Sequence, residues 1–414
     1  MACYSKIKVA ESNIRILAFP SAIGLSHLTR LLLIARELRS RGAKIAFAFK
    51  EKKQLLEQEG FDFFSVLDST ITDFSSNVFA AYTPALVEEC VKEELQVIEA
   101  VKPDAIVGDF RLTAAISSRL MGVPYISVVN AYMTDYFNPV DVMIPQERSA
   151  FKHAIASTLG RGIQAVQKWA IATPFRTAAR KYGIKDLVKL YDFLRGDLTL
   201  IADLPEFCPL ESLPDNYRYI GPLIWEGLNG ATPEFLEHLN ISKIIIYATT
   251  GNTGNERLIQ LVSDAFKDDK NYEVIMTTGP FIEPTIAPKA SNCHAERFIA
   301  GSKVMEKAHI AIHCGGNGTT YQALSHGIPS VVMPFNNDQK INAWLVRKHK
   351  LGISLFRPNV TSAHLKLAVK TVLHDSDVRK NLERFKNLLK DVNGPKSAAD
   401  QILAFLKEKS EVRA

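Results

Sequence analysis

The sequence predicts an α/β protein built from two doubly wound, Rossmann-like domains that face a cleft. Short apolar runs alternate with amphipathic runs of helical spacing, and the same alternation begins again near residue 243. Strands that alternate with helices form a parallel sheet that helices cover on both faces. The 414 residues are enough for two domains with a core each. Ligands of such sheets bind at the carboxyl ends of the strands, so we expect the site there.

The first domain is expected to span residues 1–226. Its predicted strands lie at 14–19, 44–49, 105–107, 125–129 and 198–202. The strand at 198–202 is expected to close this series of parallel strands. Apolar residues recur every three or four positions in its predicted helices, which lie at 28–38, 86–101 and 113–121.

The second domain is expected to span residues 227–395, after a linker rich in glycine and proline. Its predicted strands lie at 244–248, 272–277, 310–313 and 330–333, with a helix at 256–267. The sequence Asn393-Gly394-Pro395 is typical of a break between two helices. A final helix within 396–414 is therefore expected, and we expect it to pack back on the first domain.

Composition excludes several classes of protein. With 47% hydrophobic and 23% charged residues, the chain is typical of a globular protein and not of a disordered one. No apolar run is long enough for a spanning helix, and the N-terminal residues lack a secretory signal. The five cysteines are scattered without C-x-x-C spacing, which argues against a disulfide framework or a zinc site. These features predict a cytoplasmic protein.

The net charge of +6 comes from one helical insertion at about 140–190. The window 148–185 contains no Asp or Glu, and without its eight basic residues the rest of the chain carries a charge of −2. These basic residues are Arg148, Lys152, Arg161, Lys168, Arg176, Arg180, Lys181 and Lys185. The window predicts one or two amphipathic helices, broken at Pro174, with a basic face. That face is either solvated or a contact surface for a membrane or an anionic acceptor. The excess of basic residues is confined to this one segment, so we expect no nucleic-acid binding.

A glycine-rich turn in the second half is suited to binding phosphate. The predicted strand ends at His313, glycines follow, and a helix opens near Thr319. Backbone N–H groups of such a turn and the start of the helix can bind an anion. The expected contributors are His313, Gly315, Gly316, Asn317, Gly318, Thr319 and Thr320. The turn matches neither a Walker A loop nor a G-x-G-x-x-G fingerprint, and a simple tight connection is the alternative.

Asp338 and Gln339 open a further helix, just beyond a predicted strand. Asp338 is interpreted either as a helix N-cap or, with Gln339, as a ligand of sugar hydroxyls. A second acidic pattern, Asp375-Ser376-Asp377, has the D-x-D form that some metal-dependent transferases use. Because it opens an amphipathic helix, capping explains it better than metal binding.

His27 and Asp109 are candidates for acid–base chemistry in the first half. His27 precedes the first long helix, and Asp109 follows a predicted strand of the same sheet. The positive end of the helix disfavours imidazolium, and an aspartate bound to the histidine would fix its tautomer. The alternative is structural, with a residue at the helix terminus and a cap for the next helix.

Together, these stretches resemble the family 1 glycosyltransferases, the UDP-glycosyltransferase group that includes bacterial macrolide-type enzymes with the GT-B fold. HCGGNGTT, AL, GIP, P-x-x-x-DQ and NA are similar in order and spacing to the family's nucleotide-sugar signature. HLTRLLLIARELRSRG resembles the helix of the catalytic histidine, and GDF resembles the stretch with its aspartate. YATTGNTG is similar to the first loop of the donor domain.

The resemblance implies an inverting hexosyltransferase that moves a sugar from a nucleotide-sugar donor to a hydroxyl of a small, largely apolar acceptor, as in natural product glycosylation. It makes His27 the general base and Asp109 its partner. The implied donor-binding residues are Thr250, Gly251, Asn252, Phe298, His313, Gly315, Gly316, Asn317, Gly318, Thr319, Gln322, Asp338 and Gln339. The implied acceptor-binding residues are Phe79, Tyr82, Phe110, Tyr132, Tyr136 and Phe137.

Two departures concern the donor. Gln322 stands where the family usually has a glutamate bound to the ribose, and RFIAGS replaces an aromatic-x-Pro-Gln run beside the base. UDP is the expected nucleotide, with dTDP as the alternative. We expect no metal and no cofactor, since the nucleotide-sugar is a co-substrate. The basic insertion is expected to border the acceptor entrance, with a possible peripheral membrane contact.

Two other functions fit the same architecture. A non-hydrolysing nucleotide-sugar epimerase has a similar fold but needs further acid–base groups around the sugar. A catalytically weak partner protein that binds a nucleotide-sugar would tolerate the change at Gln322.

Overall fold

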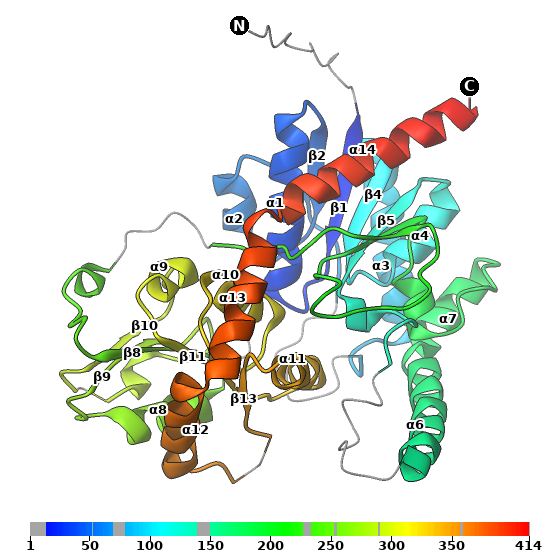
Figure 1. Ribbon diagram of the computed structural model, residues 1–414. Helices are drawn as coiled ribbons and strands as arrows, with labels where there is room; N and C mark the ends of the chain where they lie inside the picture. Colours follow the sequence, from blue (N-terminus) through cyan, green and yellow to red (C-terminus); the bar gives the residue numbers. More distant parts are fainter. Residues whose placement is uncertain are drawn as a thin grey trace, which may run out of the picture. The chain divides into compact units, whose positions relative to one another are not determined.

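The computed structural model describes residues 14–51, 53–68, 79–138, 150–226, 233–251, 255–288, 290–356 and 359–413, without the side chains of 150–159, 161, 412 and 413. The chain divides into two compact units (Figure 1). The first contains Met1–Leu223 and Asn393–Ala414, and the second contains Ile224–Val392. The division therefore lies close to the predicted boundary at residue 226.

The first unit contains a parallel sheet with the strand order β3-β2-β1-β4-β5-β6-β7. Its strands are β1 (Arg15–Pro20), β2 (Lys44–Ala48), β3 (Asp62–Phe64), β4 (Ala105–Asp109), β5 (Tyr125–Val129), β6 (Leu198–Ile201) and β7 (Tyr217–Tyr219). The prediction that the strand at 198–202 closes the series is wrong, because β7 pairs with β6. β3 and β7 have only three residues each, too few for a hydrophobic period to appear.

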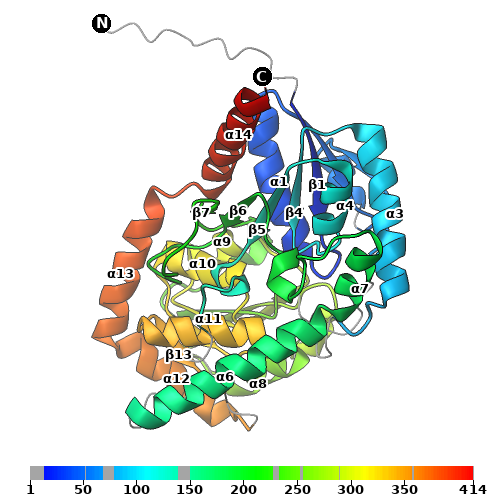
Figure 2. The same ribbon diagram turned by 90° about the vertical axis from the view of Figure 1, so that its right-hand side faces the viewer.

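Helices cover both faces of this sheet. The helices of this unit are α1 (Leu25–Ser40), α2 (Lys53–Gln58), α3 (Pro84–Val101), α4 (Ala114–Met121), α6 (Ala150–Ile171), α7 (Thr173–Lys181) and α14 (Gly394–Arg413), with short 3-10 turns η1 (Ala131–Met133) and η2 (Leu190–Phe193). α1 and α14 pack together on one face, and α3 and α4 pack together on the other (Figure 2). The break between α6 and α7 falls beside Pro174, in the first turn of α7, where a proline needs no backbone donor.

The second unit contains a parallel sheet with the strand order β10-β9-β8-β11-β12-β13. Its strands are β8 (Ile244–Thr249), β9 (Tyr272–Thr277), β10 (Cys293–Glu296), β11 (Ile310–His313), β12 (Ser330–Val332) and β13 (Gly352–Ser354). Its helices are α8 (Glu256–Phe266), α9 (Gly301–Met305), α10 (Asn317–His326), α11 (Asn337–Lys348), α12 (Ser362–His374) and α13 (Ser376–Lys390), with η3 (Glu234–Leu236) and η4 (Pro284–Ile286). Apolar side chains of β8, β11 and α10 share a core cluster.

The D-x-D pattern caps α13, as predicted. The Asp375 carboxylate accepts the backbone N–H groups of Asp377 and Val378, and Asp377 forms an ion pair with Lys350. Elsewhere among the described residues, no group of three or more His, Cys, Asp or Glu side chains is arranged to hold a metal ion.

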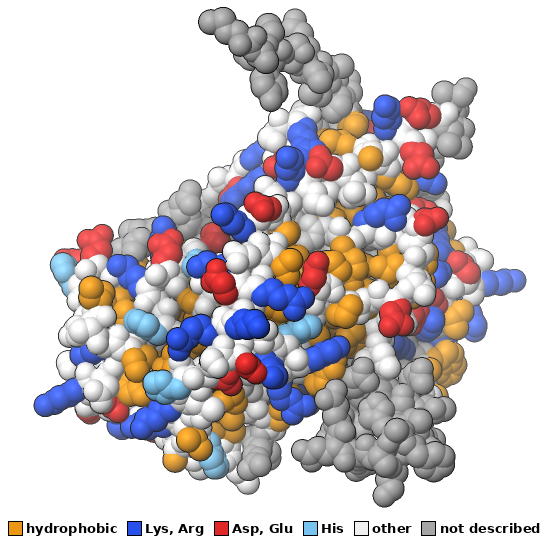
Figure 3. All heavy atoms as spheres, viewed as in Figure 1, with side chains coloured by type: hydrophobic (Ala, Val, Ile, Leu, Met, Phe, Trp, Pro, Cys, Tyr) orange, Lys and Arg blue, Asp and Glu red, His pale blue; other side chains and the backbone are white. Residues whose placement is uncertain are grey.

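On the face in Figure 3, basic and acidic side chains are interspersed, without one continuous basic field. Within the described part of the chain, no helix combines the length and the apolar character needed to cross a bilayer.

Each sheet reverses its direction of winding at its centre, which places the loops that bind ligands. The reversal lies between β1 and β4 in the first sheet and between β8 and β11 in the second. In register, Pro20 lies opposite Asp109, and Thr249 lies opposite His313. The carboxyl ends of strands at such a switch point bind ligands in doubly wound folds. The residues that follow these strands are therefore the first to consider.

Candidate active site

His27 and Asp109 meet at the switch point of the first sheet. His27 lies in the first turn of α1, directly after the β1 loop, and Asp109 ends β4. The Nδ1 atom of His27 lies 2.7 Å from Oδ1 of Asp109. The Asp109 side chain is completely buried, whereas 11% of the His27 side chain is exposed. Because the carboxylate accepts from Nδ1–H, the lone pair of the imidazole is on Nε2.

The carboxylate of Asp109 is held ionised by a residue that the sequence analysis missed. Arg30 donates from Nε to Oδ2 at 2.7 Å and from Nη2 to Oδ1 at 2.5 Å, and its Nη1 donates to Asn130 at 2.8 Å. Burial acts to raise the pKa of Asp109, but Arg30 and His27 outweigh burial, so the pKa lies below its ordinary 3.8. Arg30 lies three residues after His27, on the same face of α1, and this spacing was the available signal.

A buried ionic cluster fixes the two loops on either side of this pair. Arg111 donates from Nε to Glu94 at 2.7 Å, and its Nη1 lies 2.8 Å from Asp68. Asp68 in turn accepts the backbone N–H of Ala22 at 2.7 Å, in the loop that leads to His27. The cluster thus links the residues after β4 to the residues after β1.

Phe110 holds the other side of the His27 ring. The two rings are stacked, with centroids 5.3 Å apart and planes inclined by 11°. Phe110 has a φ of 55°, in the left-handed region that non-glycine residues rarely adopt. Such strain persists where the surroundings impose it, often at functional sites. Phe79 lies against the Phe110 ring, with the two ring centroids 6.0 Å apart.

The other predicted acceptor residues differ in their surroundings. Tyr82 is buried, packs on Phe175 and donates to Asp68, so it belongs to the core. Tyr132 is also buried, inside η1. Tyr136 is partly exposed and packs edge-on against Tyr217, and Phe137 follows it in the same half-buried segment. Aromatic residue type alone did not separate core from pocket.

The glycine turn after β11 orients His313. The Gly315 N–H donates to Nδ1 of His313 at 3.0 Å, so the ring proton is on Nε2. Burial lowers the pKa of His313 from 6.5 to about 4, so the ring is neutral at physiological pH. Its buried Nε2 has no hydrogen-bond partner among the described residues. The side chain therefore presents an unused donor.

Gly315 is required by the turn, whereas Gly316 is not. Gly315 has a φ of 90°, and a Cβ there would lie 2.9 Å from the backbone oxygen of Gln339. A Cβ on Gly316 would meet nothing within 4 Å. Asn342 donates to the Gly315 carbonyl at 2.8 Å and so holds the turn from α11. Asn342 was quoted in the sequence signature, but its role was not recognised.

The helix that follows, α10, begins at Asn317, with Gly316 as its N-cap. Gly318 is exposed and Thr319 is half-buried in the first turn, where backbone N–H groups have no acceptor within the helix. Thr320 does not supply a hydroxyl donor as predicted, because its Oγ1 donates to the Gly316 carbonyl at 2.9 Å.

Asp338 lies exposed in the first turn of α11, after the end of β12. The interpretation of Asp338 as the N-cap is wrong, because Asn336 caps the helix and accepts from the Gln339 N–H at 3.0 Å. Gln339 is buried, and its Oε1 accepts from the N–H of Phe335 at 2.8 Å. The Gln339 oxygen thus stabilises the turn that presents Asp338.

The remaining predicted donor residues differ in their surroundings. Thr250 is buried and donates to the Thr278 carbonyl at 2.8 Å, so its hydroxyl proton is already used. Gly251 has a φ of 57° after β8, and Asn252 lies outside the described residues. Gln322 is 9% exposed and donates to the Trp225 carbonyl at 3.3 Å. Another predicted residue, Phe298, is 57% exposed.

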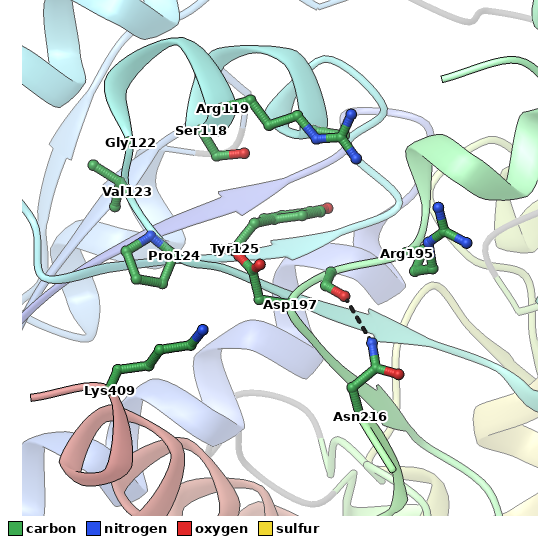
Figure 4. Close-up of a pocket in the computed structure, with 12 residues that line it drawn as sticks. Ser118, Arg119, Gly122, Val123, Pro124, Tyr125, Arg195, Asp197, Asn216 and Lys409 are labelled. Atoms are coloured by element: carbon green, nitrogen blue, oxygen red, sulfur yellow. Dashed lines mark hydrogen bonds between the residues drawn. The ribbon is translucent and has the colours of Figure 1, made fainter. Parts of the chain in front are cut away.

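One cavity of about 480 Å³ lies at the opposite edge of the first sheet, near the amino ends of β5 and β6. Figure 4 shows it between α4, the β6 approach and α14, with Arg119, Arg195 and Lys409 around it. Asp109 ends β4 at the other edge, because β4 and β5 are parallel. The cavity is therefore not part of the His27 site.

Comparison with known proteins identifies the family. The family model for the C-terminal domain of erythromycin biosynthesis protein CIII-like proteins matches residues 267–404. A PGL/p-HBAD biosynthesis rhamnosyltransferase from Mycobacterium bovis (strain BCG / Pasteur 1173P2) is 28% identical over 387 residues, which cover 91% of this chain and 84% of that protein. An inactive PGL/p-HBAD biosynthesis glycosyltransferase from the same strain is 30% identical over 263 residues, covering 61% and 70%. The chain belongs to the family 1 glycosyltransferases.

Solved structures confirm the GT-B fold of this glycosyltransferase. CalG4, the calicheamicin glycosyltransferase, superposes with a TM-score of 0.72 at 22% identity, covering 96% of this chain and 99% of that chain. SsfS6, a glycosyltransferase from Streptomyces sp. SF2575 complexed with thymidine diphosphate, gives 0.65 at 18% identity, covering 95% and 100%. This glycosyltransferase thus shares with them the GT-B arrangement of two parallel-sheet α/β domains. The epimerase alternative is set aside.

Proposed function

We propose that this glycosyltransferase moves a sugar from a nucleoside-diphosphate sugar to a hydroxyl of a small, largely apolar acceptor with inversion, and that His27 is the general base. The 2.7 Å bond from His27 Nδ1 to buried Asp109 carries the proposal. It leaves the Nε2 lone pair available and stabilises the imidazolium that forms when a proton is taken.

The reaction is a single displacement. The acceptor oxygen forms a bond to the anomeric carbon as its proton passes to Nε2 of His27. The bond from that carbon to the diphosphate oxygen breaks, and its electron pair leaves with the diphosphate. Attack from the face opposite the leaving group inverts the configuration.

The leaving diphosphate gains negative charge, and the second unit offers donors for it. His313 is proposed to donate from its unpartnered Nε2–H, together with N–H groups of the glycine turn and α10. We propose that these donors act without a metal ion or other cofactor. Transfer rates should then be the same in EDTA and in added Mg²⁺, and loss of activity in EDTA that Mg²⁺ restores would contradict this part.

The acceptor class is proposed from the surroundings of His27. Phe110 and Phe79 are half-buried and form a continuous aromatic surface with the His27 ring. Such a surface suits an apolar or aromatic acceptor better than a charged one.

UDP is the donor nucleotide that the family resemblance favours, but two observations favour dTDP. The Gln322 amide donates to a backbone carbonyl, and its Oε1 lies only 2.7 Å from where a Cβ of Gly301 would be, so the side chain is closely confined. A deoxyribose offers one hydroxyl fewer to be bound. One structural neighbour was also crystallised with thymidine diphosphate.

Titration calorimetry with UDP, dUDP and TDP tests the donor. The three ligands separate the contribution of the 2′-hydroxyl from that of the thymine methyl group. Tighter binding of dUDP than UDP would support the Gln322 argument, and tighter binding of UDP would overturn it.

His27→Ala and Asp109→Asn test the chemistry, and His238→Ala is the control because 72% of the His238 side chain is exposed. We expect His27→Ala to lower the transfer rate by about 10²–10⁴-fold. Nucleotide binding should stay unchanged in both variants, since the predicted donor-binding residues lie in the second unit. The anomeric configuration of the product, read by NMR, tests inversion. Wild-type transfer rates in His27→Ala would refute the proposed base.

A further inference from the structure

Among the described side chains of helix α6, at residues 160 and 162–171, three large apolar residues face solvent. Ile163, Val166 and Trp169, three residues apart, are 60%, 66% and 51% exposed. This spacing places them on one side of the helix, and we call them the α6 apolar stripe. The polar Lys168 turns toward the protein instead, with its Nζ 4.0 Å from the centre of the Tyr191 ring. A helix whose only role is to cover the core buries its apolar side.

The segment that carries the stripe is strongly basic. The window 148–185 contains eight basic residues and no acidic residue. α7 continues from the end of α6 (Figures 1 and 2) and carries exposed cations. Arg180 and Lys185 are exposed and form no ion pair within the described part of the chain. The acidic neighbours are neutralised, since Glu88 pairs with Lys181 and Asp135 pairs with Lys168.

Trp169 is fixed in its exposed position. Arg176 was expected on the basic face, but it is buried, and its guanidinium lies 4.1 Å from the centre of the Trp169 ring. Its Nη1 also donates to the backbone oxygens of Trp169 and Val188, at 2.9 Å and 2.8 Å. The arginine therefore holds the indole at the end of α6, where half of its surface stays in water.

We propose that α6 docks onto the surface of an anionic lipid bilayer, with the α6 apolar stripe inserted among the lipids and the nearby cations at the headgroups. Basic amphipathic helices bind such surfaces by combining apolar burial with attraction to anionic lipid. Tryptophan side chains are favoured at this depth because one edge of the indole is polar. Since α6 does not qualify as a spanning helix, it lies in the plane of the interface.

An anionic bilayer fits this surface better than a protein partner or a second copy. Outside the window, the chain carries a net charge of −2, so a second copy offers only a weak counter-charge. A bilayer supplies a uniform negative field along the whole of α6 and accepts any arrangement of apolar side chains. The inference does not depend on the proposed chemistry at His27.

Vesicle sedimentation tests the proposal with the full-length protein. We expect binding to vesicles of phosphatidylcholine with 30% phosphatidylglycerol and little binding to phosphatidylcholine alone, with affinity falling as salt rises. The double variant Ile163→Ser/Val166→Ser should bind about tenfold more weakly or worse. Ile241→Ser is the matched control, because Ile241 is 80% exposed in the second unit. Its affinity should equal that of the wild type.

Tryptophan fluorescence locates the contact. The chain has three tryptophans, of which Trp344 is buried and Trp225 is half-buried. Anionic vesicles should shift the wild-type emission to shorter wavelength as Trp169 leaves water. Trp169→Phe should still sediment with the vesicles but lose this shift.

Three results would overturn the proposal. The first is equal sedimentation with neutral and anionic vesicles, or none with either. The second is unchanged vesicle binding in Ile163→Ser/Val166→Ser. The third is a stripe variant that keeps its vesicle binding and shows a different effect. That effect would be a change from dimer to monomer, measured by light scattering, or a higher KM for a water-soluble acceptor.

Discussion

Arg30 provides a demanding test of the site because it shares Asp109 with His27. Its Nη2 and the His27 Nδ1 lie 2.5 Å and 2.7 Å from the same carboxylate oxygen, so the two nitrogens are at most about 5 Å apart. At an effective dielectric constant of about 20, opposite unit charges about 4 Å apart attract by about 4 kcal/mol. Arg30 is accordingly the strongest of the groups that lower the pKa of Asp109 and keep its carboxylate ionised.

Replacing Arg30 with methionine removes this attraction and leaves the charge of Asp109 unbalanced. The pKa of Asp109 should therefore rise, and we expect the acid limb of the kcat/KM profile to move to higher pH. Breaking a buried ion pair on one side also costs about 3–5 kcal/mol of the free energy of unfolding. Urea unfolding should show that loss, which is smaller than the whole free energy of unfolding of an ordinary domain.

Two companion variants separate electrostatics from packing. Arg30→Lys keeps the charge but loses the two-point contact, so it should restore the acid limb while remaining less stable than the wild type. Arg36→Met removes a cation from the same helix, where Arg36 pairs with partly exposed Glu59, and should leave the profile unchanged. A folded Arg30→Met enzyme with an unmoved acid limb would refute the reasoning.

Three further predictions concern stability and the turn residues. Because burial lowers the pKa of His313 from 6.5 to about 4, the unfolded chain binds a proton in that window and the folded chain does not. Proton uptake by His313 in the unfolded chain should therefore lower the free energy of unfolding by about 2 kcal/mol between pH 7.5 and pH 5. Urea titrations should show this decrease in His238→Gln but not in His313→Gln. Gly315→Ala should lower both thermal stability and nucleotide affinity by calorimetry, because of its φ of 90° and the crowded Cβ, whereas Gly316→Ala should be tolerated. Phe110→Gly should relieve about 1–2 kcal/mol of backbone strain but lower the transfer rate roughly tenfold through loss of stacking, and Phe110→Tyr should retain activity. Equal transfer rates in Phe110→Gly and Phe110→Tyr would count against the positioning role.

The sequence was most informative where a local pattern marks the end of a strand. His27, Asp109 and His313 all lie beside strands that show as apolar runs, and the topology then brings each to a switch point. Strand β3, in contrast, has three residues and alternates too briefly to be seen. A short strand is fixed by its neighbour in the sheet, and this information is not local.

Contacts between segments that are distant in the sequence could not be predicted either. Arg30 and Asp109 are 79 residues apart, and nothing near Arg30 shows that its charge is buried. The same limit applies to Arg176, which has the spacing of a basic face but is buried and holds Trp169. A formal charge count describes both residues equally well as solvated, and only packing separates them.

His27 in the first unit and His313 in the second unit have opposite tautomers, because different groups contact their Nδ1 atoms. At His27 the neighbour of Nδ1 is a carboxylate that can only accept, so the proton is on Nδ1 and Nε2 can take another. At His313 the neighbour is the Gly315 N–H, which can only donate, so the proton is on Nε2, which can donate a hydrogen bond. The ionised state of Asp109 requires Arg30, and the N–H direction at Gly315 requires a positive φ. Each tautomer therefore depends on a residue outside the histidine itself.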